Sequence, residues 1–257
     1  MIAALQTQPL TQPTLRQLMS SKYSRLDRFI SQKTLIKRKN IRLLLAQKRI
    51  QVDGKIALDT QQLIGPFNQV IFDHEILQQH SAQYWMMNKP TGVVSATKDQ
   101  KHLSVIDLLG DECAADLHIV GRLDLNSSGL ILLTNDGNWS SALTRPENKV
   151  PKRYLVDLAN KISAEYIEAF SNGMYFSYED ITTLPAKLSI IADRRAEVEL
   201  FEGKYHQIKR MFGRFRNPVL ALHRLSIGEL QLDPQLPLGQ YRALSAVEIQ
   251  SFSASDC

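Results

Sequence analysis

The feature that most constrains the fold of this chain is a short apolar run at residues 130–134, within the sequence HIVGRLDLNSSGLILLTNDG at 118–137. A glycine precedes the run and an Asn-Asp-Gly turn signal follows it, a pattern typical of a strand buried on both faces. One carboxylate, Asp124, lies before the run in a small polar loop, two residues after Arg122. An aspartate in such a loop is most often a turn or cap residue, so its function has to be judged from the rest of the chain.

The length and composition are those of a folded protein. The 257 residues, 44% hydrophobic and 22% charged, suffice for one large domain and a small one. The longest apolar runs fall far below the roughly 20 residues that span a bilayer, and no basic segment precedes an apolar core at the N-terminus. We therefore expect a protein that is neither embedded in a membrane nor exported.

The cysteines and the missing cofactor motifs narrow the chemistry. Cys113 and Cys257 are far apart and form neither a disulfide framework nor a CxxC pair, which predicts a reducing compartment, the cytoplasm. The chain has no HExxH, no phosphate-binding P-loop and no GxGxxG fingerprint. His206 and His223 lack a third ligand at suitable spacing, so we interpret them as structural or RNA-contacting. We expect no metal and no nucleotide cofactor.

Positive charge is concentrated near the N-terminus. The net charge is +5, yet residues 21–60 alone carry eleven Lys or Arg against three Asp, a net +8. Residues 1–20 add one Arg, which leaves −4 for residues 61–257. A concentrated basic surface is typical of a nucleic-acid binder, with a solvated basic helix or a membrane-surface patch as the alternatives.

This basic stretch follows a segment of different character. Residues 1–23 are rich in Gln, Thr and Ser without periodicity, which predicts a flexible extension. Ser24 is then in position to cap a first helix, and residues 37–47 predict a second helix with an apolar face. Residues 49–56 alternate with a period of two around Asp-Gly, the signal of a β-hairpin.

The module resembles the S4-type RNA-binding domain, over about residues 24–80. The matching segments are RLDRFISQ at 25–32, RLLLAQKRI at 42–50 and QVDGKI at 51–56. The resemblance implies binding to structured RNA through phosphate contacts and implies nothing about catalysis. The candidate RNA-binding residues are Arg25, Arg28, Lys37, Arg38, Arg42, Lys48 and Arg49.

A polar linker at residues 78–83 separates this module from a second domain, residues 82–257. Strands are expected at 84–88, 93–97, 130–134, 186–191, 196–201 and 229–232, and helices at 102–109, 164–172, 206–215 and 246–251. Because strands dominate the middle and do not alternate regularly with helices, we predict an α+β domain with a mixed, mainly antiparallel central sheet flanked by helices.

Four motifs of this domain resemble one family. HxxGRLDxxSxGLxLLTNDG at 118–137 is joined by NKPTG at 88–92, KRYLV at 152–156 and EGKYHQIKRMF at 202–212. Together they resemble the ribosomal pseudouridine synthases of the branch that often carries an N-terminal S4 domain. With the basic module, the resemblance extends from about residue 24 to about residue 250. It implies a cleft across the sheet and the isomerisation of uridine to pseudouridine in ribosomal RNA.

This reaction breaks the N1–C1′ bond, turns the uracil over and rejoins it through C5, with no net change in atoms. The resemblance makes Asp124 the carboxylate that acts on the uridine, either as a nucleophile toward sugar or base or as a base removing a sugar proton. Tyr154 is implied to stack on the extruded uracil, a contact worth roughly 1–3 kcal/mol. Because a closed pocket disfavours a charged carboxylate, we also expect a fixed cation beside Asp124.

Three residues are candidates for that cation. Lys209 matches the basic position of the family motif, where many relatives carry Arg, and Arg210 follows it directly. Arg122 is a rival if its segment is extended, because alternate residues then share a face. Arg210 could instead bind phosphate, and the resemblance gives Arg122 a part in holding the flipped nucleotide.

The RNA target is expected from the same resemblance. The segments at 205–212 and 222–228 are more similar to the small-subunit ribosomal RNA enzyme than to its large-subunit relatives. A large-subunit enzyme, another cofactor-free RNA-modifying enzyme, and an RNA-binding or ribosome-assembly factor without essential catalysis are the alternatives. We expect a monomer whose partner is ribosomal RNA or a pre-ribosomal particle.

Overall fold

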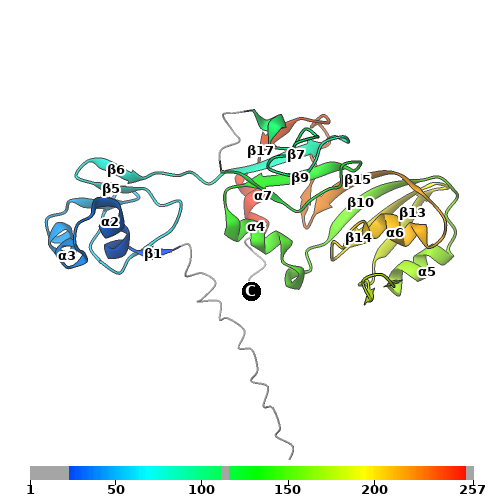
Figure 1. Ribbon diagram of the computed structural model, residues 1–257, viewed down its shortest axis with the longest axis horizontal. Helices are drawn as coiled ribbons and strands as arrows, with labels where there is room; N and C mark the ends of the chain where they lie inside the picture. Colours follow the sequence, from blue (N-terminus) through cyan, green and yellow to red (C-terminus); the bar gives the residue numbers. More distant parts are fainter. Residues whose placement is uncertain (1–22, 111–115, 253–257) are drawn as a thin grey trace, which may run out of the picture. The chain divides into compact units, whose positions relative to one another are not determined.

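A computed structural model describes residues 23–110 and 116–252 (Figure 1). The chain divides into two compact units between Ala82 and Gln83. The expected flexible extension lies, apart from residue 23, outside the described residues, as do Cys113 and Cys257. Each unit is described below by itself.

The first unit packs two amphipathic helices against small sheets. The helices present Ile30, Ile41 and Leu45 to a core that also contains Ile50 and Val70. A four-stranded sheet has the order β3-β2-β5-β6, and β1 pairs with β4. The elements are α2 (Leu26–Thr34), α3 (Arg38–Ala46), β1 (Ser24–Arg25), β2 (Ile50–Val52), β3 (Lys55–Ile56), β4 (Leu63–Ile64), β5 (Val70–Phe72) and β6 (Glu75–Gln78).

The predicted hairpin of this unit is confirmed, whereas the predicted cap is wrong. Asp53 and Gly54 have φ values of 50° and 74°, as a two-residue turn between β2 and β3 requires. Ser24 does not cap α2, because it pairs with Ile64 in a short strand. The N–H groups at the start of α2 instead donate to backbone carbonyl oxygens. Leu26 N, for example, donates to Gln62 O at 2.8 Å.

The second unit is built on a mixed, mainly antiparallel sheet of nine strands, as the sequence predicts. Its order is β13-β14-β10-β15-β9-β7-β17, with β16 added to β15 and β8 to β9. The strands are β7 (Tyr84–Lys89), β8 (His118–Val120), β9 (Ser128–Thr134), β10 (Lys152–Leu158), β13 (Lys187–Ala192), β14 (Arg195–Leu200), β15 (Val219–Ile227), β16 (Leu230–Gln231) and β17 (Tyr241–Ala243). A separate hairpin pairs β11 (Tyr175–Phe176) with β12 (Ile181–Thr182).

A short parallel seam joins the two halves of this sheet. Among the described residues, every strand pair of this sheet except β15–β9 is antiparallel. The β15–β9 pair consists of only two residue pairs, His223 with Ser128 and Arg224 with Gly129. At the seam the backbones approach closely, since a Cβ on Gly129 would lie 2.4 Å from the carbonyl oxygen of Arg224. Only glycine fits there.

Helices cover the sheet on both sides of the seam. They are α4 (Gly137–Thr144), α5 (Glu165–Ser171), α6 (Gln207–Gly213) and α7 (Ala246–Gln250), with short 3-10 turns at Asp107–Leu109 and Pro146–Asn148. In Figure 1, α5 and α6 lie together over the end of the sheet formed by β13, β14 and β10. Phe170 and Phe212 from these helices pack with Val156 in the core beneath them.

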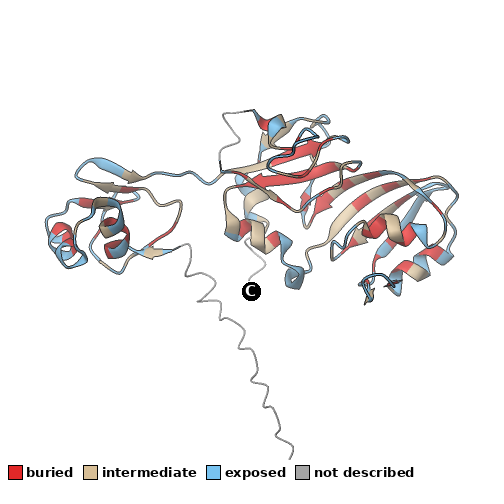
Figure 2. Cartoon of the chain, viewed as in Figure 1, coloured by how far each residue is buried: buried red, intermediate tan, exposed pale blue. Residues whose placement is uncertain are grey.

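Strand β9, which contains the apolar run at 130–134, is buried on both faces, as predicted. Leu130 and Leu132 of β9 belong to a core with Trp139 of α4, whereas Ile131 and Leu133 belong to a core with Val105. Figure 2 shows buried residues along the whole of this strand. The loop that carries Asp124 is therefore attached to a rigid element.

Three expectations for this unit fail for local reasons. Only residues 107–109 of the expected helix at 102–109 are helical, because Val105 N donates to Val94 O and holds the segment against residue 94. The strand expected at 93–97 is reduced to an isolated bridge between Val94 and Ser104, because the Ser95 hydroxyl bonds instead to the backbone of Leu123. The turn signal at 135–137 instead starts helix α4, with Asp136 accepting from Asn138 N at 2.9 Å. Strand β15 was not predicted at all. Among the described residues, no helix is long and apolar enough to cross a membrane.

Candidate active site around Asp124

The Asp124 loop is held through its backbone by two buried cations. The ammonium of Lys89, at the end of β7, donates to the carbonyl oxygens of Ser127 at 2.7 Å, Pro90 at 3.0 Å and Asp124 at 3.1 Å. Lys89 is 0% exposed, and the second cationic residue, Arg224, is 2% exposed. The loop therefore has a fixed course while its side chains remain available.

The second of these cations, Arg224 of β15, binds the backbone of the loop from the side of the seam. Its guanidinium donates to the carbonyl oxygens of Leu130 at 2.7 Å, Arg122 at 3.2 Å and Gly121 at 3.3 Å. The pKa of Lys89 is lowered to about 8, chiefly by burial; the charge of Asp124 opposes this shift and the charge of Arg224 adds to it.

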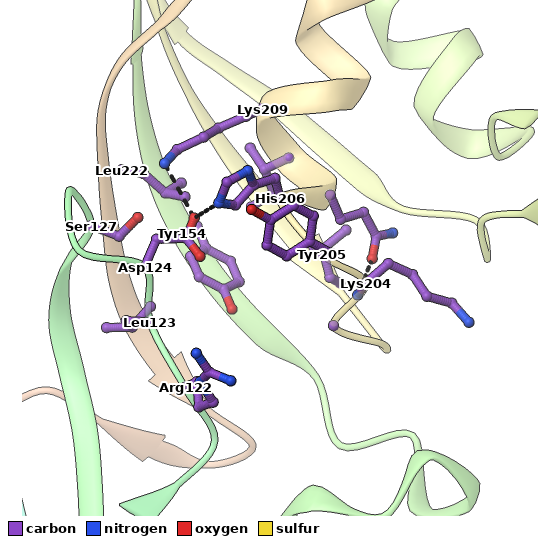
Figure 3. A pocket seen from close by; sticks show the side chains of 14 residues that line it. Arg122, Leu123, Asp124, Ser127, Tyr154, Lys204, Tyr205, His206, Lys209 and Leu222 are labelled. Carbon is purple, nitrogen blue, oxygen red and sulfur yellow. Dashed lines mark hydrogen bonds and ion pairs between the residues drawn. The ribbon is translucent and has the colours of Figure 1, made fainter. Parts of the chain in front are cut away.

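The Asp124 carboxylate lies between the ammonium of Lys209 and the imidazole of His206. Lys209 Nζ is 3.2 Å and His206 Nε2 is 3.5 Å from the same oxygen, Oδ2. Oδ1 carries neither of these two contacts. About a third of the Asp124 side chain is exposed, so the carboxylate can be reached from solvent. Figure 3 shows Lys209 and His206 converging on Asp124 from helix α6 and the residue before it.

The two rival cations lie elsewhere. Arg210, next to Lys209 on α6, turns to Glu179, with Nη1 2.6 Å from Oε1, and its guanidinium lies 3.8 Å from the centre of the Phe176 ring. Arg122 lines the same cavity as Asp124 but at a separate part of its wall (Figure 3). Of the three candidates, the structure thus places Lys209 against the carboxylate.

A cavity of about 360 Å³ opens beside Asp124. Its volume is in the range of small-ligand sites. The buried ring of Tyr154, from β10, forms part of the wall next to Asp124, and Leu222 of β15 adds apolar surface (Figure 3). The lining residues are Arg122, Leu123, Asp124, Ser127, Tyr154, Leu200, Gly203, Lys204, Tyr205, His206, Gln207, Ile208, Lys209 and Leu222.

Sequence reasoning missed part of this wall. The sequence does not predict that His206, interpreted as structural or RNA-contacting, lies against Asp124, nor that the Tyr205 ring stacks on His206. The available signal was their position directly before the Gln-Ile-Lys segment. His223 accepts or donates a 2.9 Å hydrogen bond with the Ser128 hydroxyl, and burial lowers its pKa. Among the described residues, no group of three or more His, Cys, Asp or Glu side chains could hold a metal.

The candidate RNA-binding residues of the first unit are all exposed, and they differ in whether they form one of the ion pairs within the unit. Arg28, Lys37, Arg42 and Lys48 form none of these pairs. Arg25 and Arg38 pair with Asp27 at 3.1 and 3.0 Å, and Arg49 pairs with Asp73. Burial opposes the charge on Asp27, but hydrogen bonds and charges from these arginines and the Arg28 N–H hold the pKa of its carboxyl below the usual range. The first group is thus the freer to meet an anionic partner.

The fold and the site together bring a carboxylate, its ammonium partner and an aromatic ring to the wall of one cavity, the arrangement of a candidate active site. The chain belongs to the RNA pseudouridylate synthase family, which its residues 83–213 match. A Pseudomonas aeruginosa protein, ribosomal small subunit pseudouridine synthase A, is 46% identical over 88% of this chain and 99% of its own length. The Escherichia coli K12 protein of the same name is 38% identical over the same shares.

A solved structure agrees with these relatives. A crystal structure described as that of a pseudouridylate synthase superposes with a TM-score of 0.65 and 36% sequence identity. It covers 89% of this chain and 99% of the other. The similarity therefore includes both units and not the catalytic segment alone.

Proposed function

We propose that this protein converts one uridine of small-subunit ribosomal RNA to pseudouridine, with Asp124 as the reacting carboxylate. The observation that carries the proposal is the Asp124–Lys209 pair at the wall of a nucleobase-sized cavity in a chain of this family. The names of its relatives, matched over nearly their whole length, favour the small-subunit RNA over the large-subunit RNA.

The reaction requires one carboxylate and an enclosed pocket in which the uracil base can rotate. The N1–C1′ bond breaks, the uracil rotates, C5 bonds to C1′, and the proton on C5 leaves as N1 gains one, so atoms balance. Asp124 serves in its ionised form whether it attacks sugar or base or removes a sugar proton. An ammonium 3.2 Å from Oδ2 stabilises negative charge there.

Tyr154 and Arg122 hold the uridine in this proposal. Tyr154, a residue only 8% exposed, lines the cavity, and its ring offers an apolar surface on which a uracil removed from its stack can lie. Such stacking is worth roughly 1–3 kcal/mol per base. Arg122, at the cavity wall, is placed to contact the sugar or phosphate of the same nucleotide.

The first unit supplies RNA affinity in this proposal, as an S4-like domain of residues 24–80. Its exposed Arg28, Lys37, Arg42 and Lys48 support phosphate contacts, while Arg25, Arg38 and Arg49 add charge from existing ion pairs. Arg210 of the second unit, paired with Glu179, adds a further positive charge for the RNA. We place the protein in the cytoplasm as a monomer that acts on ribosomal RNA or a pre-ribosomal particle without a nucleotide cofactor.

The test is the variant Asp124→Asn, with Asp193→Asn as the matched control. Asp193 pairs with Lys161 on the surface, 73% exposed, so its variant removes the same charge away from the cavity. Pseudouridines are mapped in ribosomal RNA of cells that carry the wild type, either variant or no protein. We expect the modification with the wild type and Asp193→Asn only, and unchanged RNA affinity in both variants.

Three other outcomes would each contradict a different part of the proposal. Full turnover by Asp124→Asn would refute the catalytic role of this residue. A modification confined to large-subunit RNA would refute the choice of substrate. RNA binding without any modification by the wild type would favour the assembly-factor alternative.

A further inference from the structure

The wall of the cavity contains an exposed aromatic ring for which the reaction has no use. Tyr205 is 73% exposed, although it lines the cavity, and its ring stacks on that of His206 with centroids 3.9 Å apart and planes 21° apart. An aromatic side chain held in solvent by stacking on one neighbour presents its remaining surface for binding. Figure 3 shows this pair between Asp124 and Lys204.

The backbone beneath the pair is fixed. His206 adopts a left-handed conformation with φ of 48° at the start of α6, which is uncommon for a residue with a side chain. Gln207, 3% exposed, closes the preceding loop, because its side chain accepts from Lys204 N at 3.0 Å and donates to Glu202 at 2.8 Å. The same Glu202 oxygen accepts from Leu184 N at 2.8 Å. The ring pair is therefore displayed on a braced loop.

The chemistry around the ring suits a nucleotide. Lys204, adjacent to Tyr205, also lines the cavity and is 44% exposed. Aromatic rings that stack bases, interleaved with cations that meet phosphates, are the usual means of binding single-stranded nucleic acid. A base extruded into the cavity also leaves its neighbour in the strand without one stacking partner.

We propose that the Tyr205–His206 pair is a subsite for the base of a nucleotide next to the target uridine. This inference rests on the proposed function. The subsite and the reacting carboxylate adjoin, since His206 Nε2 lies 3.5 Å from Asp124 Oδ2 while the face of its ring supports Tyr205. A uridine on Tyr154 and its neighbour on Tyr205 thus occupy the inside and the rim of one cavity.

The test uses RNA fragments centred on the uridine that the mapping experiment identifies. Each fragment is made intact and with an abasic residue on the 5′ or the 3′ side of that uridine. The proteins are the wild type, Tyr205→Leu, Tyr205→Phe and the control Tyr178→Leu, whose tyrosine is 94% exposed and lies outside this cavity. Pseudouridine formation gives kcat and KM, and thermal melting checks that each variant is folded.

On intact RNA we expect Tyr205→Leu to lower kcat/KM roughly 5- to 150-fold, the range that corresponds to one stacked base. Tyr205→Phe keeps the ring and should stay within about twofold of the wild type, as should Tyr178→Leu. Removing one flanking base should lower the wild type to the level of Tyr205→Leu and leave Tyr205→Leu unchanged.

Two results would overturn the subsite while leaving the proposed function intact. One is a Tyr205→Leu variant as active as Tyr178→Leu on intact RNA. The other is an abasic substitution that lowers the wild type and Tyr205→Leu by the same factor at both positions. A wild type that forms no pseudouridine in ribosomal RNA would overturn the proposed function and the subsite with it.

Discussion

Replacing Lys89 by methionine tests how the Asp124 loop is held. Methionine has a similar volume but removes the ammonium and its three hydrogen bonds. The buried Ser127 carbonyl loses its partner, which costs about 1–3 kcal/mol, whereas Asp124 O keeps a bond from Ser127 N at 3.0 Å. A pKa lowered from 10.5 to about 8 means that the buried charge costs about 3 kcal/mol at neutral pH. The two effects nearly cancel, so we expect a variant that is folded and about as stable as the wild type at pH 7.

The pH dependence distinguishes this account from simple packing. Between pH 8 and 10.5 the unfolded chain still binds the Lys89 proton that the folded protein has released, so the free energy of unfolding rises with pH. The Lys89 contribution to this rise is about 2.5 kcal/mol from pH 7 to pH 10, and Lys89→Met lacks it. Urea unfolding of both proteins at the two pH values measures the difference, with the exposed Lys187→Met as control. Parallel stability profiles for the wild type and Lys89→Met would refute a buried, charged Lys89.

Activity provides the second readout of the same variant. Without its anchor the Asp124 loop shifts, and a displacement of about 1 Å at a reacting group lowers turnover on the order of 100-fold. In the wild type, a neutral Lys89 donates at most two of its three hydrogen bonds, so turnover should also decline above pH 8. Full turnover by Lys89→Met would show that the loop is held without this residue.

Three further perturbations test other contacts. Lys209→Met should abolish most pseudouridine formation, and Lys209→Arg should retain it. Arg210→Met removes contacts with Glu179, Phe176 and the Tyr205 carbonyl but none with Asp124, so it should change turnover less than Lys209→Met does. Equal losses in Lys209→Met and Arg210→Met would contradict the pairing of Lys209 with Asp124. Gly129→Ala should lower the free energy of unfolding by at least about 1–3 kcal/mol, because the backbone φ is +103° and the added Cβ would collide with the Arg224 backbone. An unchanged midpoint in urea unfolding would contradict the close approach of the β9 and β15 backbones. Arg42→Gln should weaken RNA binding and reduce the slope of log affinity against log salt by about 0.7, and an unaltered slope would remove Arg42 from the phosphate contacts.

The elements that the sequence predicted correctly are those set by local pattern. Strand β9 has apolar residues at successive positions, and each alternate set packs into its own core. The Asp-Gly hairpin and helices α3, α5 and α6 follow from turn chemistry and periodicity in the same way. The family motif also favoured Lys209 as the cation beside Asp124, with Arg210 and Arg122 as rivals, and the directions of the side chains on α6 and in the loop agree with that choice.

The parts that escaped prediction depend on contacts between distant segments. Residues 102–109 have helical periodicity, but pairing with Val94 overrides it. Lys89 and Arg224 would be placed at the surface by their charge, and only the converging carbonyls of a folded loop make their burial acceptable. The Tyr205–His206 pair likewise depends on a left-handed residue and a buried glutamine that no periodicity encodes.

The two-pair seam between β15 and β9 also joins the two halves of the candidate active site. Asp124 belongs to the half of the sheet that contains β9, whereas Tyr154 and Lys209 come from the half that contains β10 and α6. Neither half alone holds the carboxylate and its ammonium together. Under the proposed function, a chain in which this junction has not formed lacks the paired carboxylate, so the conversion of uridine requires a contact of only two residue pairs.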